Sequence, residues 1–257
     1  MMSDSYFVLG PDLLIAAVLL AFFAGFVKGA VGFALPMIMI SGLGSFLAPE
    51  IALAGLIIPA LVTNFWQALR NGLAQAIHSI QGHWRYLTIL VFCLALSAQL
   101  VTRLNEEALF LVLGVPVTIF AAVQLAGWQL SIDPRNRRRT ELGLGAFAGA
   151  FGGISGVWGP PTVMYLTALK TPKQEQMRVQ GVVYGAGAVM LTLAHLRSSI
   201  LNAETAKLSA LLVLPALLGI ALGFAVQDRM SQEKFRRATL LVLIIGGLNL
   251  IRRGMVG

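Results

Sequence analysis

Two stretches of the chain share a spacing of glycines and a proline that could bind an anion. They read GFVKGAVGFALP (25–36) and GAFGGISGVWGP (149–160), and both fit the pattern GxxxGxxGxxxP. Proline suits the first turn of a helix, because its missing N–H would have no intrahelical partner there. The free N–H groups of such a helix start carry partial positive charge. The sequence therefore predicts anion-binding helix starts near 33–36 and 158–162.

Lys28 lies inside the first of these stretches and is the one charged residue deep in an apolar segment. An ionisable side chain in such a position is a candidate for function by default, and an ammonium could supply a full positive charge to an anion. The alternative is that Lys28 snorkels to the interface, because it lies near the C-terminal end of its helix.

Neutral donors and close backbone positions near the two breaks complete the predicted substrate site. The predicted substrate-binding residues are Lys28, Gly29, Gly32, Phe33, Asn64, Gln67, Ser155, Gly156, Trp158, Gly159, Pro160, Thr162, Tyr165, Gln180 and Tyr184. Hydrogen bonds between helices are the alternative role for the amides and Tyr184, and ordinary packing is the alternative for Trp158 and Tyr165.

Catalytic chemistry has one candidate motif, GISG (153–156), in which Ser155 could be a nucleophile with His195 as base. The matching position in the first stretch is Val31, so the repeated pattern does not need a nucleophile. The sequence has no Walker motif, paired catalytic carboxylates or metal-ligand cluster. We therefore predict no catalytic residue, no metal and no cofactor.

The composition of the chain indicates the environment in which these residues lie. The chain has 257 residues, 57% hydrophobic and 12% charged, with a mean hydropathy of +0.81, which is typical of a polytopic membrane protein. A spanning helix needs roughly 20 apolar residues. Segments near that length lie at 12–31, 50–69, 86–101, 106–128, 177–196, 206–226 and 235–251. The net charge of +8 is read as a record of membrane orientation rather than of nucleic-acid binding, so the lipid bilayer is the expected partner.

The repeated motif divides the chain into two membrane repeats, 1–130 and 142–257, joined by a basic cytoplasmic linker, 131–141. Each repeat contains about five helical segments, and an odd number inverts the second repeat relative to the first. With the N-terminus outside, most Lys and Arg residues fall in cytoplasmic connections. Four spans per half in parallel repeats distribute these charges more evenly, so we prefer the inverted arrangement.

The second segment of each repeat is short and begins at the proline, at 33–47 and 159–169. These segments either cross the membrane or form re-entrant hairpins with the preceding helix. Irregular backbone is tolerated in a membrane only where protein or a water-lined cavity satisfies its polar groups. Matching breaks in two repeats therefore predict one interior site at the repeat interface.

The chain resembles the sulfite exporter TauE/SafE family over nearly its whole length. The resemblance is carried by GFVKGAVGFALP, GGISGVWGPPTVMYL and the polar turns LAPEIA and LKTPKQEQ. It implies export of a small sulfur-containing anion, such as sulfite or an organosulfonate, by a carrier of the bacterial-type inner membrane without a nucleotide-binding domain. We expect alternating access at a midplane site between the repeats. An anion channel is the alternative, followed by an intramembrane enzyme, and the sequence is compatible with a monomer or a homo-oligomer.

Overall fold

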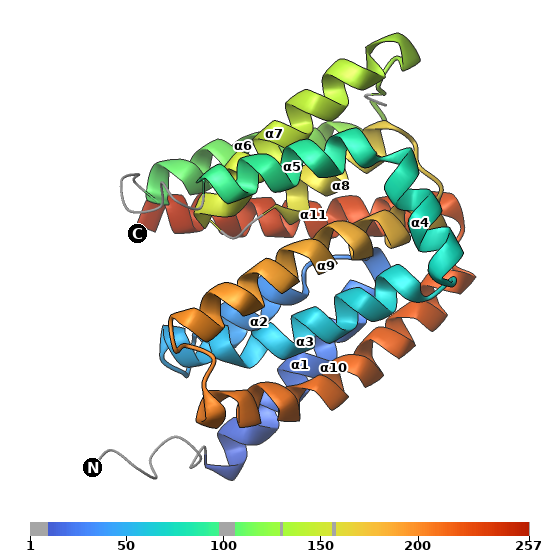
Figure 1. The fold of residues 1–257 in the computed structure, drawn as a ribbon. Helices are drawn as coiled ribbons and strands as arrows, with labels where there is room; N and C mark the ends of the chain where they lie inside the picture. The colour runs from blue at the N-terminus through green and yellow to red at the C-terminus, as the bar shows by residue number, and fades with distance from the viewer. Residues whose placement is uncertain (1–9, 98–105, 129–130, 156–157, 257) are drawn as a thin grey trace. The chain divides into compact units, whose positions relative to one another are not determined.

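The computed structural model describes residues 10–97, 106–128, 131–155 and 158–256, and these residues form helices with no β-strand (Figure 1). In chain order the helices are α1 (Pro11–Val31), α2 (Leu35–Leu43), α3 (Pro49–Leu69), α4 (Leu73–Gly82), α5 (Trp84–Ser97), α6 (Glu106–Leu125), the 3₁₀ helix η2 (Pro134–Asn136), α7 (Arg137–Ser155), α8 (Gly159–Ala168), α9 (Lys173–Arg197), α10 (Ala203–Arg229) and α11 (Gln232–Val256). The all-α prediction is confirmed.

Five of these helices are long and apolar enough to cross a membrane, when the described residues alone are searched. They are α1, α3, α9, α10 and α11, and they match five of the long apolar segments that the sequence predicts. The predicted segments 86–101 and 106–128 correspond to the shorter apolar helices Trp84–Ser97 and Phe110–Leu125. The chain is therefore a multi-span membrane protein.

The two short helices begin at the prolines of the repeated motif. α2 has Pro36 in its first turn, and α8 has Pro160 and Pro161 there. With 9 and 10 residues, each helix is about 15 Å long, roughly half the thickness of a hydrocarbon core. The two short helices that the sequence predicts are therefore present as α2 and α8.

The described helices belong to two compact units, each of which takes segments from both halves of the sequence. Unit 1 comprises residues 1–70 and 181–230, and unit 2 comprises 71–180 and 231–257. Unit 1 therefore contains α1, α2, α3, the later part of α9, and α10, while unit 2 contains α4 to α8, the first turns of α9, and α11. The predicted linker 131–141 holds η2 and the start of α7. The inverted repeat stays a prediction.

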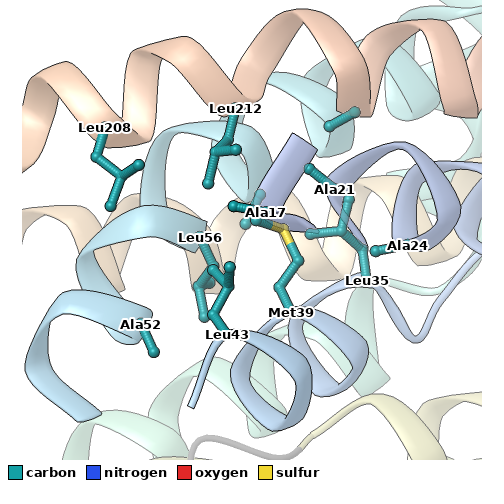
Figure 2. Close-up of a cluster of buried hydrophobic side chains, with 12 residues drawn as sticks. Ala17, Ala21, Ala24, Leu35, Met39, Leu43, Ala52, Leu56, Leu208 and Leu212 are labelled. Carbon is teal, nitrogen blue, oxygen red and sulfur yellow. The ribbon is translucent and has the colours of Figure 1, made fainter. Parts of the chain in front are cut away.

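The core of unit 1 is built from small and branched side chains spaced one helical turn apart (Figure 2). This spacing puts successive apolar residues on one helix face. The buried cluster consists of Ala17, Ala21 and Ala24 of α1, Leu35, Met39 and Leu43 of α2, Ala52, Leu56 and Ala60 of α3, and Leu208, Leu212 and Ala216 of α10. It fixes α2 between its neighbours.

Glycines bring the backbones of α1 and α10 into direct contact. A Cβ atom on Gly25 would meet the backbone of Ala216, and one on Gly29 would meet the backbones of Ile220 and Gly223. Gly223 in turn faces Gly29. Small residues allow such close approach of helices in lipid, so the first two glycines of the first motif are packing positions against α10.

Pro59 interrupts the hydrogen-bond ladder of α3, and a serine from α10 compensates. A proline in a helix removes the N–H that would bond to the carbonyl four residues earlier. The hydroxyl of Ser209 donates to the carbonyl of Gly55 at 3.3 Å and accepts from the N–H of Ile58 at 3.1 Å. Ser209 is fully buried, so this contact satisfies backbone groups that have no access to water.

Unit 2 uses the same small-residue contacts on other helices. Gly145 and Gly149 of α7 lie against the backbone of α5, at Tyr86 and Leu90 respectively. Gly114 of α6 packs against the backbone of α11. α8 packs against α6, α7 and α11. The close contact of α7 with α5 positions the aromatic and charged groups described below.

Candidate anion site

The break between α1 and α2 has a backbone conformation that favours glycine. Gly32 has a φ of 91° and Ala34 a φ of 80°, both in the left-handed region. That region is unfavourable for a residue with a side chain and is often found at functional sites. The N–H of Gly32 donates to the carbonyl of Lys28 at 2.6 Å, and its own carbonyl accepts from Gln67 Nε2 at 3.0 Å. Gln67 of α3 therefore holds the break in place.

Lys28 is buried one turn before this break, with 1% of its surface exposed. Its ammonium donates a hydrogen bond to Asn64 Oδ1 of α3. It also lies 5.6 Å from the ring centroid of Tyr184 on α9, within the range of a cation–π contact. In this structure the ammonium is turned into unit 1 rather than toward its surface.

Asn64 links Lys28 to the second half of the sequence. Its Nδ2 donates to the backbone carbonyl of Tyr184 at 3.2 Å. We call Lys28, Gly32, Asn64, Gln67 and Tyr184 the Lys28 cluster. It joins α1, α3 and α9 inside unit 1, so five predicted site residues from both halves of the chain meet there.

The Lys28 cluster contains a cation and no anion. Among the described residues no carboxylate forms an ion pair with Lys28, and its hydrogen-bond acceptor is the neutral amide of Asn64. Gln67 supplies a second neutral side chain. The cluster thus surrounds a buried lysine with neutral partners.

Two other predicted site residues lie at the break with different surroundings. Phe33 is buried between α1 and α2. Gly29 faces α10, while its neighbour Lys28 contacts α3 and α9. Gly29 therefore lies beside the cluster and sets the distance between α1 and α10.

The second break places Trp158 immediately before α8. The carbonyl of Trp158 accepts from the hydroxyl of Thr162 at 2.8 Å, and a Cβ on Gly152 would meet the Trp158 side chain at 2.8 Å. Gly159 and Pro160 form the first turn of α8. Ser155 is the last residue of α7 and its side chain is not described, and Gly156 lies outside the described residues.

Thr162 and Tyr165 point into unit 2, where protein groups engage their hydroxyls. Thr162 Oγ1 accepts from the hydroxyl of Tyr86 at 2.9 Å, and the rings of Tyr86 and Tyr165 stack with centroids 4.2 Å apart. The Tyr165 hydroxyl lies 2.8 Å from His83 Nδ1 and donates to Glu141 Oε1 at 3.2 Å. Both residues are buried, so this arrangement ties α8 to α5 and α7.

Gln180, on α9, is fully buried in unit 2, and its amide has no hydrogen-bond partner among the described residues. The next residue, Gly181, lies against the backbone of Ala68 on α3. Among the described residues, no hydrogen bond joins Gln180 to the Lys28 cluster.

A charged network around Tyr165 was not predicted from the sequence. Glu141 is buried, and it accepts from Arg137 Nε at 2.8 Å and from Arg85 Nη1 at 3.5 Å. His83 is also buried, and its Nε2 lies 3.2 Å from Glu175 Oε1. The spacing of Arg137 and Glu141 by four residues is the one local signal that points to part of this network.

The described residues form helices only, and five of these helices are candidate membrane spans, so the chain falls in the class of polytopic α-helical membrane proteins. The chain belongs to the sulfite exporter TauE/SafE family, whose model matches residues 17–250. The resemblance drawn from the motifs is thereby confirmed. No match was found among curated proteins or among solved structures. Membership assigns the chain to a family of exporters of sulfite.

Proposed function

We propose that this chain is a secondary carrier that exports a small sulfur-containing anion, such as sulfite or an organosulfonate, and that the Lys28 cluster binds the anion. The observation that carries the proposal is a buried ammonium whose partners are a neutral amide and an aromatic ring. A positive charge in a membrane costs roughly 2.5–3.5 kcal/mol on insertion scales. A bound anion offsets that cost.

The donor count of the cluster leaves capacity for a ligand. An ammonium has three N–H donors, and among the described residues one of them is taken by Asn64. Charge-assisted hydrogen bonds to an oxyanion are about twice as strong as neutral ones. An oxyanion can therefore be held by Lys28 without a fixed counter-charge in the protein that would have to be displaced.

The break at Gly32 supports alternating access as the mechanism. Gln67 and Asn64 on α3 hold the Gly32 carbonyl and Lys28 together, and Tyr184 adds α9 from the second half. A movement of α9 relative to α3 would change the partners of Asn64 and with them the position of the ammonium. The chain has no nucleotide-binding motif, so the energy comes from a gradient. Membership of the family supports a bacterial-type inner membrane, and the Lys and Arg placement supports an orientation with the N-terminus outside.

Flux measurements on reconstituted protein test this proposal. Proteoliposomes loaded with isotopically labelled sulfite should show saturable efflux that accelerates when unlabelled sulfite is added outside, because exchange is a property of carriers. Empty liposomes and a carboxylate substrate of similar size serve as controls. Non-saturating flux with single-channel currents proportional to voltage would establish the channel alternative and overturn the carrier.

A further inference from the structure

The charged network around Tyr165 in unit 2 needs more protons than a neutral His83 and the Tyr165 hydroxyl together carry. Three contacts run in sequence from Glu175 Oε1 to His83 Nε2, from His83 Nδ1 to the Tyr165 hydroxyl, and from that hydroxyl to Glu141 Oε1. Their lengths are 3.2, 2.8 and 3.2 Å. Each contact needs one proton. A neutral imidazole and a phenol together carry two protons, and an imidazolium and a phenol carry three.

The surrounding charges decide where the third proton resides. Glu141 accepts from two guanidinium groups, those of Arg137 and Arg85, and it is also the acceptor in its contact with the Tyr165 hydroxyl. The Tyr165 hydroxyl therefore donates its hydrogen bond to Glu141, and His83 Nδ1 must donate to the Tyr165 oxygen. A carboxylate is less basic than an imidazole, so the remaining proton rests on His83 Nε2 and is donated to Glu175.

We propose that His83, which lies between α4 and α5, is a proton-binding site, and that its protonated form fastens the first turn of α9 to the α4–α5 junction and to α8 through Glu175 and Tyr165. Histidine is the side chain that ordinarily changes charge between about pH 5 and 8. When His83 loses its proton, one of the three contacts is lost. The attachment of α9 then weakens as the pH rises.

Other charged groups around His83 come from every neighbouring helix. α4 contributes His78, α5 contributes Arg85 and Tyr86, α7 contributes Arg137 and Glu141, and α9 contributes Glu175 and Arg178. Arg178 is bonded to Ser79 at 3.2 Å. On α11, which packs against α8, Arg236 is bonded to Gln124 of α6, and Arg237 is paired with Glu233. Among the described residues, the groups bonded directly to the imidazole are Glu175 and Tyr165.

Hydrogen exchange on the full-length protein in detergent tests the proposal without any substrate. The measured quantity is the protection of residues 173–180, corrected for the intrinsic pH dependence of exchange, at about pH 5 and about pH 8. We expect protection in the wild type to fall several-fold as the pH rises, and the His83→Gln protein to show no such change. His78→Gln, a substitution of an exposed histidine on α4, is the matched control and should behave like the wild type. Equal pH dependence in His83→Gln and wild type would overturn the proposal.

A second measurement leaves the network intact. The chain has three histidines, so the double variant His78→Gln/His195→Gln retains His83 alone. Nitrogen-15 NMR of its imidazole should show both ring nitrogens protonated at low pH and loss of one proton as the pH rises to about 8. An imidazole that stays neutral from about pH 5 upward would contradict the proposal.

Discussion

The ammonium of Lys28 donates a hydrogen bond to Oδ1 of Asn64, and this contact joins α1 to α3 inside unit 1. The two residues are 36 positions apart in the chain. Asn64 also donates to the Tyr184 carbonyl, so its amide is oriented with the oxygen toward the cation. Lys28 thus has a neutral acceptor and, among the described residues, no ion pair with a carboxylate, and the first two predictions follow from this charge balance.

Replacing Lys28 with Met should abolish or strongly weaken anion binding while preserving the volume of the side chain. A hydrogen bond to a charged group contributes about 1.5–3 kcal/mol, so affinity should fall at least about tenfold. Binding to purified protein by calorimetry measures this directly. Lys28→Arg should retain binding but slow export, because a planar guanidinium differs in shape from an ammonium. Unchanged affinity in Lys28→Met would leave the helix starts as the anion-binding elements.

Replacing Asn64 with Asp should inhibit export more than replacing it with Ser. The aspartate places a carboxylate beside Lys28, where it forms an internal ion pair and occupies the position of the substrate's charge. Asn64→Ser removes the amide but adds no charge and is therefore the matched control. Sulfite efflux from proteoliposomes, normalised to inserted protein, compares the two. Equal rates in both variants would show that the charge balance of the cluster does not govern transport.

Adding a methyl group at Gly29 should destabilise the protein, whereas the same change at Gly143 should not. Ala at position 29 would press a Cβ against the backbone of Ile220 and Gly223, while nothing lies within 4 Å of a Cβ on Gly143. Overpacking costs about 1–3 kcal/mol, and Ala at an open helical site is favoured over Gly by up to about 1 kcal/mol. Thermal unfolding in detergent measures both. A matching effect in the two variants would argue against the α1–α10 contact.

Replacing Ser209 with Ala should destabilise unit 1. The hydroxyl serves the Gly55 carbonyl and the Ile58 N–H beside Pro59, and a buried group left without a partner costs about 1–3 kcal/mol. Ser209→Thr retains the hydroxyl and serves as the control. The unfolding midpoint in a denaturant series is the measurement. No loss of stability in Ser209→Ala would show that another group satisfies the backbone at this proline.

Export should become faster as the pH rises if the protonated His83 holds α9 in place. α9 also carries Tyr184, whose carbonyl bonds to Asn64, so fastening its first turn restrains a helix of the Lys28 cluster. An alkylsulfonate is the appropriate substrate, since it stays a monoanion throughout this range. Its efflux should rise with pH in the wild type and in His78→Gln, and be flat in His83→Gln. Efflux that does not change with pH in the wild type would show that the protonation of His83 does not control transport.

The sequence by itself determined the membrane class and the two short helices, and it singled out Lys28 as a candidate for function. These features depend on local physics. Apolar length predicts a span, proline and glycine predict a helix break at Gly32 and before Pro160, and a charge in apolar sequence marks a site of function. The family resemblance followed from the same motifs, because the spacing of glycines and proline occurs in both halves of the chain.

The tertiary structure alone decided which of these residues meet. Lys28 contacts Asn64 and Tyr184 because α1 and α3 share unit 1 with the later part of α9, and helix rotation and register are set by packing rather than by local sequence. The same packing turns Tyr165 toward His83 and Glu141. The burial of His83 has no local signal in the sequence, because it depends on helices that are distant in the chain. The number of protons that His83 must carry can be counted only when the positions of Glu141 and Glu175, which are distant in the chain, are known.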